Sequence, residues 1–120
     1  MKKIILTFSL LLAYFSNTAQ TGTEFWFAPP DVTFSHNSPG GVPIYLNMST
    51  LSQPVTVTLD QPANLGFTPI VIAIPANSSH QEDLSAFVAD LETAPTNAVL
   101  NTGLRITSTD TIAAYYEVSN

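Results

Sequence analysis

Residues 55–59 read Val-Thr-Val-Thr-Leu and alternate apolar and polar side chains without a break. Alternation with a period of two places one set of side chains on each face of a β-strand. We therefore expect a strand whose aliphatic side chains point into a core while its two threonines face outward. Asp-Gln-Pro at 60–62 follows directly and is typical of a turn that ends such a strand.

Three other segments have the same strand character. Residues 23–28 (Thr-Glu-Phe-Trp-Phe-Ala) end at two prolines, and their apolar residues fall on both faces, which predicts a strand covered on both sides. Residues 43–50 alternate apolar and polar side chains. Residues 70–74 (Ile-Val-Ile-Ala-Ile) form an aliphatic run that ends at a proline, as expected for a further strand.

The last third of the chain is predicted to form a hairpin. Residues 103–108 and 111–118 have strand-forming sequences, and Thr109 and Asp110 separate them. This linker lacks the glycine that tight hairpin turns prefer, so the turn type stays open. Residues 115–120 contain no glycine, proline or positive charge, so we expect the final strand to leave an unpaired edge.

One segment departs from the β pattern. Its apolar residues Leu84, Phe87, Val88 and Leu91 are spaced i, i+3, i+4 and i+7, which places them on one face of a helix. We expect a short helix near 84–93 that crosses over between strands. It should dock this face on a sheet, because so short a helix is not stable alone.

Together these elements predict an all-β domain over residues 20–120. We expect a β-sandwich, Ig-like or jelly-roll-like, of short antiparallel strands with one crossover helix. About 100 residues in some six strands bury little surface for such a fold. The thin core and the unprotected final strand predict that the domain is incomplete at its C-terminal end and opens a longer chain.

Residues 1–19 have the three-part layout of a secretory signal peptide. Two lysines precede an apolar run, and small and polar residues lead to Ala19. The run is too short for a membrane span, which needs about 20 apolar residues. We expect cleavage between Ala19 and Gln20 and a product that is secreted or on the cell surface, not an integral membrane protein. A buried N-terminal helix is the alternative, and it fits the charge placement less well.

Composition excludes several classes of function. The 120 residues include 3 Lys and Arg and 9 Asp and Glu. Cleavage would leave Arg105 alone against the nine acidic residues, a net charge of −8. Nucleic acids are bound through clustered Lys and Arg, so no nucleic-acid partner is expected. The chain has no cysteine, which excludes disulfides and cysteine-based zinc sites.

The sequence offers no catalytic constellation, and we do not expect an enzyme. His36 and His80 have polar surroundings typical of loops, and no G-x-S-x-G elbow is present. Neither histidine has a second ligand at metal-binding spacing, so we expect no metal and no cofactor, with calcium on scattered loop carboxylates left open. The acidic residues between 82 and 92 are interpreted as a solvated face; a site for a cation or a basic partner is the alternative.

Aromatic side chains are the remaining candidates for a binding surface. Adjacent strand residues point to opposite faces, so Trp26, or one of Tyr115 and Tyr116, is expected on an outer face. Core packing is the more frequent use of such residues. Trp26, Tyr115 and Tyr116 are therefore candidates for ligand binding, as is His36, and the sequence assigns no particular ligand.

Three segments together resemble a known domain family. They are residues 22–28 (Gly-Thr-Glu-Phe-Trp-Phe-Ala), 55–58 followed by 70–75, and 101–108 followed by 111–116. They are similar to the family named for the N-terminal region of IgG-Fc-binding protein. That family opens with a G-x-x-F strand and closes with G-hydrophobic-x-I-x-S and x-x-I-x-x-Y. The resemblance covers most of residues 22–118.

Bacterial members of this family stand at the N-terminus of large secreted or surface proteins, including gliding-associated proteins of the type IX secretion route. The resemblance implies a non-catalytic binding or adhesion module. Its partners would be an extracellular protein or glycan surface and downstream domains of the same chain. It implies neither catalytic residues nor IgG binding. Two alternatives stay open: a structural spacer or cap that presents downstream domains, and an accessory domain of a secreted hydrolase.

Overall fold

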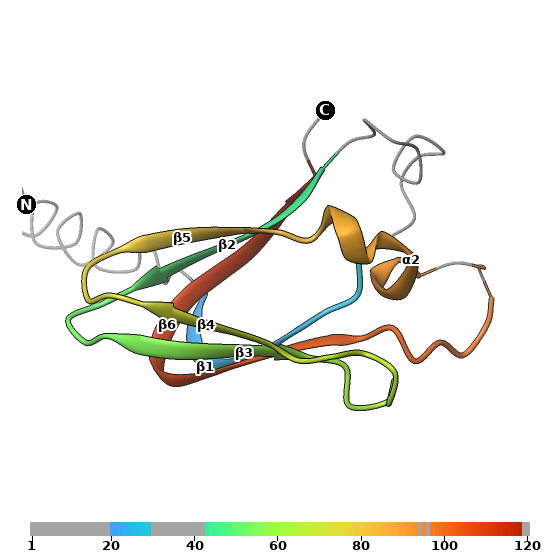
Figure 1. Ribbon diagram of the computed structural model, residues 1–120, viewed down its shortest axis with the longest axis horizontal. Helices are drawn as coiled ribbons and strands as arrows, with labels where there is room; N and C mark the ends of the chain where they lie inside the picture. Colours follow the sequence, from blue (N-terminus) through green and yellow to red (C-terminus); the bar gives the residue numbers. More distant parts are fainter. Residues whose placement is uncertain (1–19, 30–42, 94, 96, 119–120) are drawn as a thin grey trace, which may run out of the picture.

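The computed structural model describes residues 20–29, 43–93, 95 and 97–118. The expected signal peptide at 1–19 and the segment that contains His36 lie outside the described residues. The strands form one antiparallel sheet (Figure 1). In chain order the elements are β1 (Thr21–Phe27), β2 (Ile44–Thr50), β3 (Val55–Asp60), β4 (Ile70–Ile74), β5 (Ser79–Asp83), the 3-10 turn η2 (Ser85–Phe87), α2 (Val88–Leu91) and β6 (Leu104–Val118).

Strand β6 runs through the middle of the sheet and pairs with three other strands. β1 lies along one of its edges, where Trp26 is opposite Arg105 and Gly22 is opposite Ile112. The other edge is shared, because β3 pairs with the first half of β6 up to Ser108 and β2 pairs with the second half from Ile112 onward. β4 then extends the sheet beyond β3, and β5 extends it beyond β2.

The sheet bends where β6 leaves β3 and joins β2. Residues 109–111 have no register partner in any of the three ladders of β6. Thr109 Oγ1 instead accepts a hydrogen bond of 3.0 Å from the backbone N–H of Thr56. The buried side chains stay at even-numbered positions on both sides of the bend, from Leu104 to Ala114. One strand therefore supplies core residues to both halves of the sheet, which curls toward a barrel (Figure 1).

The prediction of a hairpin is wrong. Residues 104–108 and 111–118 belong to one continuous strand, and Gly103 immediately precedes it. The linker has no glycine to reverse the chain, and the β-branched residues at 107, 109, 111 and 112 favour extended backbone. The first half of β6 pairs with β3 and the second half pairs with β2, both on the same edge, so the chain does not need to reverse. Residues 114–118 pair with β2 on one edge and with no described strand on the other, in agreement with the expected unpaired edge.

The core confirms the alternation predicted for residues 55–59 and 43–50. Aliphatic side chains of β2, β3, β4 and β6 meet inside the curled sheet. The largest fully buried ones are Ile44, Leu46, Met48, Leu59, Leu84, Leu91, Leu104, Ile106, Ile112 and Val57. The all-β class with one short helix is confirmed. The described strands form one continuous sheet, and this pairing does not establish a two-sheet sandwich.

The sequence predicted that β1 is covered on both sides, and this prediction is wrong. Phe25 packs into the core at 8% exposure, whereas Trp26 on the opposite face is 57% exposed. Phe27 again turns inward, where its ring meets that of Tyr116 edge-on at 5.8 Å between centroids. The apolar character of the strand thus has two causes, core packing on one face and an exposed indole on the other.

The predicted helix is shorter than expected, but its apolar face is confirmed. η2 and α2 connect β5 to β6, and Leu84, Val88 and Leu91 are buried. Phe87 is partly buried and contacts Phe67, with ring centroids 5.7 Å apart. Neither helical turn has a side-chain cap, which is consistent with a helix that ends after one turn.

β5 was missed, and His80 lies in this strand and not in a loop. Its sequence, Ser-His-Gln-Glu-Asp, has no apolar residue and so carries no strand signal. The segment is extended because it pairs with β2, where Met48 is opposite His80 and Leu46 is opposite Glu82. β5 is an edge strand, where polar residues are tolerated.

A buried glutamine ties the helical turn to the sheet. The Gln61 side-chain amide donates hydrogen bonds to the carbonyls of Asp90 at 2.8 Å and Thr102 at 2.9 Å. Its Oε1 accepts a hydrogen bond of 2.8 Å from Asn64. Gln61 is only 4% exposed, and these bonds satisfy its buried polar atoms. The sequence placed this residue in a turn and gave no sign of its burial.

Truncation of a core leucine should be far more damaging than truncation of a surface one. Leu59 is 0% exposed and Leu65 is 99% exposed. We expect Leu59→Ala to lower the free energy of unfolding by about 2–5 kcal/mol, because it removes buried contacts and leaves a cavity. Leu65→Ala should change it by less than about 0.5 kcal/mol. Urea denaturation measures both, and equal effects would contradict the assignment of the core.

Candidate functional site

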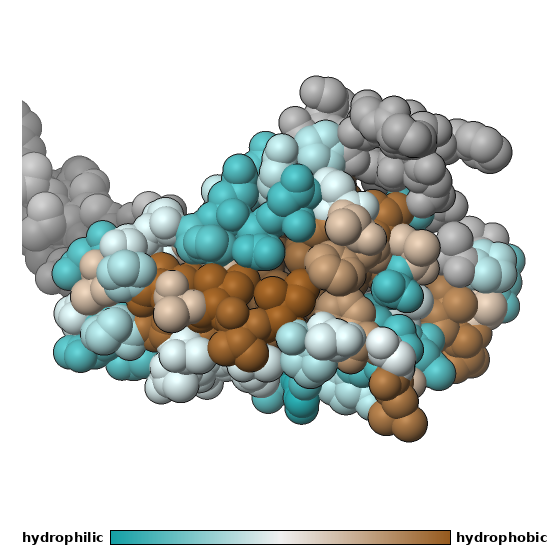
Figure 2. Space-filling view, in the orientation of Figure 1, coloured by the Kyte–Doolittle hydropathy of each residue, from teal (hydrophilic) through white to brown (hydrophobic). Residues whose placement is uncertain are grey.

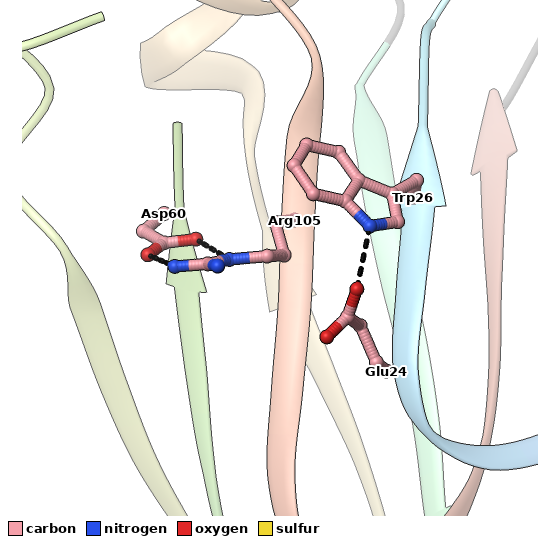
Figure 3. A network of polar contacts seen from close by, with 4 residues as sticks. All are labelled: Glu24, Trp26, Asp60 and Arg105. Atoms are coloured by element: carbon pink, nitrogen blue, oxygen red, sulfur yellow. Dashed lines mark hydrogen bonds and ion pairs between the residues drawn. The ribbon is translucent and has the colours of Figure 1, made fainter. Parts of the chain in front are cut away.

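Three charged or aromatic residues form one row across the outward face of β1, β6 and β3. Trp26 is opposite Arg105 in the β1–β6 ladder, and Arg105 is opposite Asp60 in the β6–β3 ladder. Glu24 lies two residues before Trp26 on the same face of β1. Figure 3 shows the four side chains together on this face. We call these four residues the Trp26 platform.

Arg105 and Asp60 form a two-pronged ion pair. Nε of Arg105 donates to one carboxylate oxygen of Asp60 at 2.9 Å, and Nη2 donates to the other at 2.5 Å. These hydrogen bonds, aided by the positive charge, hold the pKa of the Asp60 carboxyl below its ordinary value. Both side chains keep contact with solvent, so the pair orients Arg105 more than it stabilises the fold.

The indole of Trp26 is held from two directions. Its Nε1 donates a hydrogen bond of 2.8 Å to Glu24, and the guanidinium of Arg105 lies 5.8 Å from the ring centroid (Figure 3). Gly103 lies close to the ring, so that a Cβ at this position would be 3.8 Å from Cε3 of the indole. Trp26 nevertheless remains 57% exposed. The result is an oriented aromatic surface beside the carboxylate of Glu24, with the carboxylate of Asp60 on the far side of Arg105.

The other candidate residues are not brought to this platform. Tyr115 is 59% exposed but lies on the β2-paired half of β6, opposite Asn47. Tyr116 points the other way and packs against Phe27. The prediction that Trp26 or one of the two tyrosines faces outward is therefore confirmed for Trp26 and Tyr115. His36 lies outside the described residues.

Sequence reasoning did not identify Glu24, Asp60 and Arg105 as members of a site. Asp60 and Arg105 are 45 residues apart, and only the β3–β6 register joins them. Asp60 was interpreted as a turn residue, yet it ends β3 and binds Arg105. One signal was available: Arg105 is the only cation after residue 3 in an acidic chain, so a carboxylate partner could have been sought for it.

The acidic residues between 82 and 92 do not form one solvated face. Glu82 pairs with His80 at 2.9 Å, and Asp83 accepts hydrogen bonds from Ser85. Glu92 is 5% exposed, and its Oε1 has no hydrogen-bond partner among the described residues. The solvated-face interpretation is therefore wrong for Glu92, because the chain turns back toward the sheet there: Thr93 binds the carbonyl of Pro29.

Within the described ranges, no group of three or more His, Asp or Glu side chains is placed to hold a metal ion. No helix in the same part of the chain is both long enough and apolar enough to cross a membrane.

Comparison with protein-family models, with curated proteins and with solved structures found no match to this chain. Function is therefore inferred from the Trp26 platform and its surroundings.

The ion pair should be visible in the titration of Asp60. We expect its carboxyl to titrate below the ordinary range for aspartate, and Arg105→Gln to move the midpoint back up. A lowered folded-state pKa means that the pair contributes stability above the ordinary pKa of aspartate, and that this contribution is lost as the pH falls through the folded-state pKa. Carboxyl NMR shifts followed against pH measure both midpoints. Identical midpoints in the two proteins would exclude the guanidinium as the cause.

Proposed function

We propose that this chain is an exported, non-catalytic binding or adhesion module of a bacterial cell-surface or secreted protein, and that it binds through the Trp26 platform. The observation that carries the proposal is the 57% exposure of Trp26 on an outer sheet face. Glu24 and Arg105 hold the indole in place, so little side-chain freedom is lost when a ligand binds. Oriented, exposed tryptophans of this kind are typical anchors of binding surfaces.

An extracellular glycan or protein surface fits this platform. A sugar ring or an apolar side chain can stack on the indole, and the carboxylates of Glu24 and Asp60 can accept hydrogen bonds from hydroxyl or amide groups. Arg105 is already bound by Asp60, so it offers little to an anionic ligand. The nine acidic residues of the chain further favour a neutral or basic partner over an anionic one.

The family resemblance supports the same proposal. Trp26 and Glu24 belong to the segment 22–28, and Arg105 belongs to the segment 101–108, both of which resemble the family named for the N-terminal region of IgG-Fc-binding protein. In this proposal the domain is a sandwich whose layers are the two halves of the curled sheet. The layout of residues 1–19 supports export of the chain.

Removal of the indole should abolish binding. We would screen the secreted form of the chain against immobilised oligosaccharides and extracellular proteins, and then measure Trp26→Ala and Trp26→Phe on every ligand that binds. We expect Trp26→Ala to weaken binding at least about tenfold, as loss of a central aromatic anchor does. Trp26→Phe should retain most of the affinity, because it keeps an aromatic face.

Tyr115→Ala is the matched control, since it removes an aromatic of similar exposure from the other half of the sheet. It should leave the affinity within about twofold of the starting value, well below one tenfold step. Equal losses in Trp26→Ala and Tyr115→Ala would count against the platform. Absence of any ligand in the screen would favour the role of a structural spacer instead.

A further inference from the structure

Three strands, β1, β4 and β5, have a single neighbour in the sheet among the described residues, and the last two follow one another in the chain. Among the described residues β4 pairs only with β3, and β5 pairs only with β2. The turn at 75–78 joins them, and the hydroxyl of Thr50 binds the carbonyls of Pro75 and Ser78 within it. Figure 1 shows the two strands diverging from this turn. The curled sheet therefore stays open between β4 and β5.

β4 borders this opening with an uncharged edge. All five of its residues are aliphatic: Ile72 and Ile74 are buried, Ile70 is partly buried, and Val71 is 64% exposed on the outer face. Figure 2 shows a hydrophobic band along β4, bordered by the hydrophilic surface of β5. Natural edge strands are usually protected by charged residues, prolines or bulges, and β4 has none within its bounds.

An apolar hollow lies at the end of β4 near the turn. It has a volume of about 370 Å³ and is lined by Pro54, Val55, Thr56, Ala73, Ile74 and Pro75. It is shallow and lies where β3 begins and β4 ends. A side chain at one end of a strand laid along β4 could fill it. The β4 edge thus offers backbone hydrogen-bonding groups along its length and an apolar recess at one end.

The other side of the opening is acidic. Glu82 and His80 lie on the inward side of β5, opposite the buried Leu46 and Met48 of β2, and they pair with each other. Asp83 ends the same strand. The only cation after residue 3 is Arg105, which Asp60 already binds. No cation of the described chain is thus free to balance the acidic side of the opening.

We propose that the opening between β4 and β5 binds one extended segment of a basic partner polypeptide by strand addition to β4. The backbone of the segment would pair with the free edge of β4, as in other strand-addition complexes. Aliphatic side chains at every second position would continue the row of Ile70, Ile72 and Ile74, and a Lys or Arg would face Glu82. A second copy of this chain is the poorer occupant, because two strongly acidic molecules repel each other.

Three labelled peptides test the ligand chemistry by fluorescence anisotropy with the secreted form of the chain. They are Lys-Thr-Val-Thr-Val-Thr-Val-Thr-Lys, whose lysines and valines lie on the same face of a strand, the same core flanked by Glu, and the Lys-flanked peptide with its central Val replaced by Pro. We expect the Lys-flanked peptide to bind at least about tenfold more tightly than the Glu-flanked one at low salt, with a smaller ratio at high salt. The Pro peptide should not bind, because proline removes a backbone donor.

Two variants of β4 test the site, since they add the same charge to the same strand on opposite faces. Ile70→Lys alters the inward rim of the opening, and Val71→Lys alters the exposed outer face. We expect Ile70→Lys to weaken binding of the Lys-flanked peptide at least about tenfold more than Val71→Lys does. Thermal unfolding of both variants checks that they are folded. Equal losses in two folded variants would overturn the proposal.

Glu82→Gln tests the charge argument separately. It should remove most of the preference for Lys over Glu flanks while the Lys-flanked peptide still binds. An unchanged preference would contradict the assigned role of Glu82, and sedimentation of the chain as a dimer through β4 would make a second copy the occupant. Trp26→Ala should leave peptide binding unchanged, so this result is independent of the platform's function.

Discussion

The rest of the structure depends on the bend of β6. A strand that is hydrogen-bonded along both edges normally keeps the same two neighbours, but β6 exchanges β3 for β2 on one edge while β1 stays on the other. The exchange takes place over residues 109–111, where side chains of Thr109 and its neighbours replace ladder bonds. Because the alternation stays in phase, both halves of the strand face the same core.

This bend also determines what lies on the outside. The first half of β6 carries Arg105 between Trp26 and Asp60, and the second half carries Tyr115 between the polar residues of β2 and the open edge. Trp26 and Tyr115 therefore lie on separate surfaces. The curl of the sheet also leaves β4 and β5 as edge strands joined by one turn, which is why an aliphatic edge and an acidic edge border the same opening.

Local pattern predicted the parts of this fold that depend on local physics. Buried faces were identified correctly from the alternation in residues 43–50 and 55–59 and from the helical spacing of Leu84, Val88 and Leu91. The spacing of apolar residues along an element determines which of its faces is buried. The continuous β6, the polar β5 and the pairing of Arg105 with Asp60 depend on register between distant segments. No local signal encodes such register, so the hairpin was predicted wrongly and the ion pair was missed.

Cross-strand proton contacts measured by NMR test the central feature, the continuous and bent β6, most directly. A continuous strand predicts contacts of Ile106 with Leu59 of β3 and of Ala114 with Met48 of β2. A hairpin closed at residues 109–110 would instead place residue 106 opposite residue 113 and residue 108 opposite residue 111. The first set of contacts would support the bend and the surfaces that follow from it. The second set would contradict both.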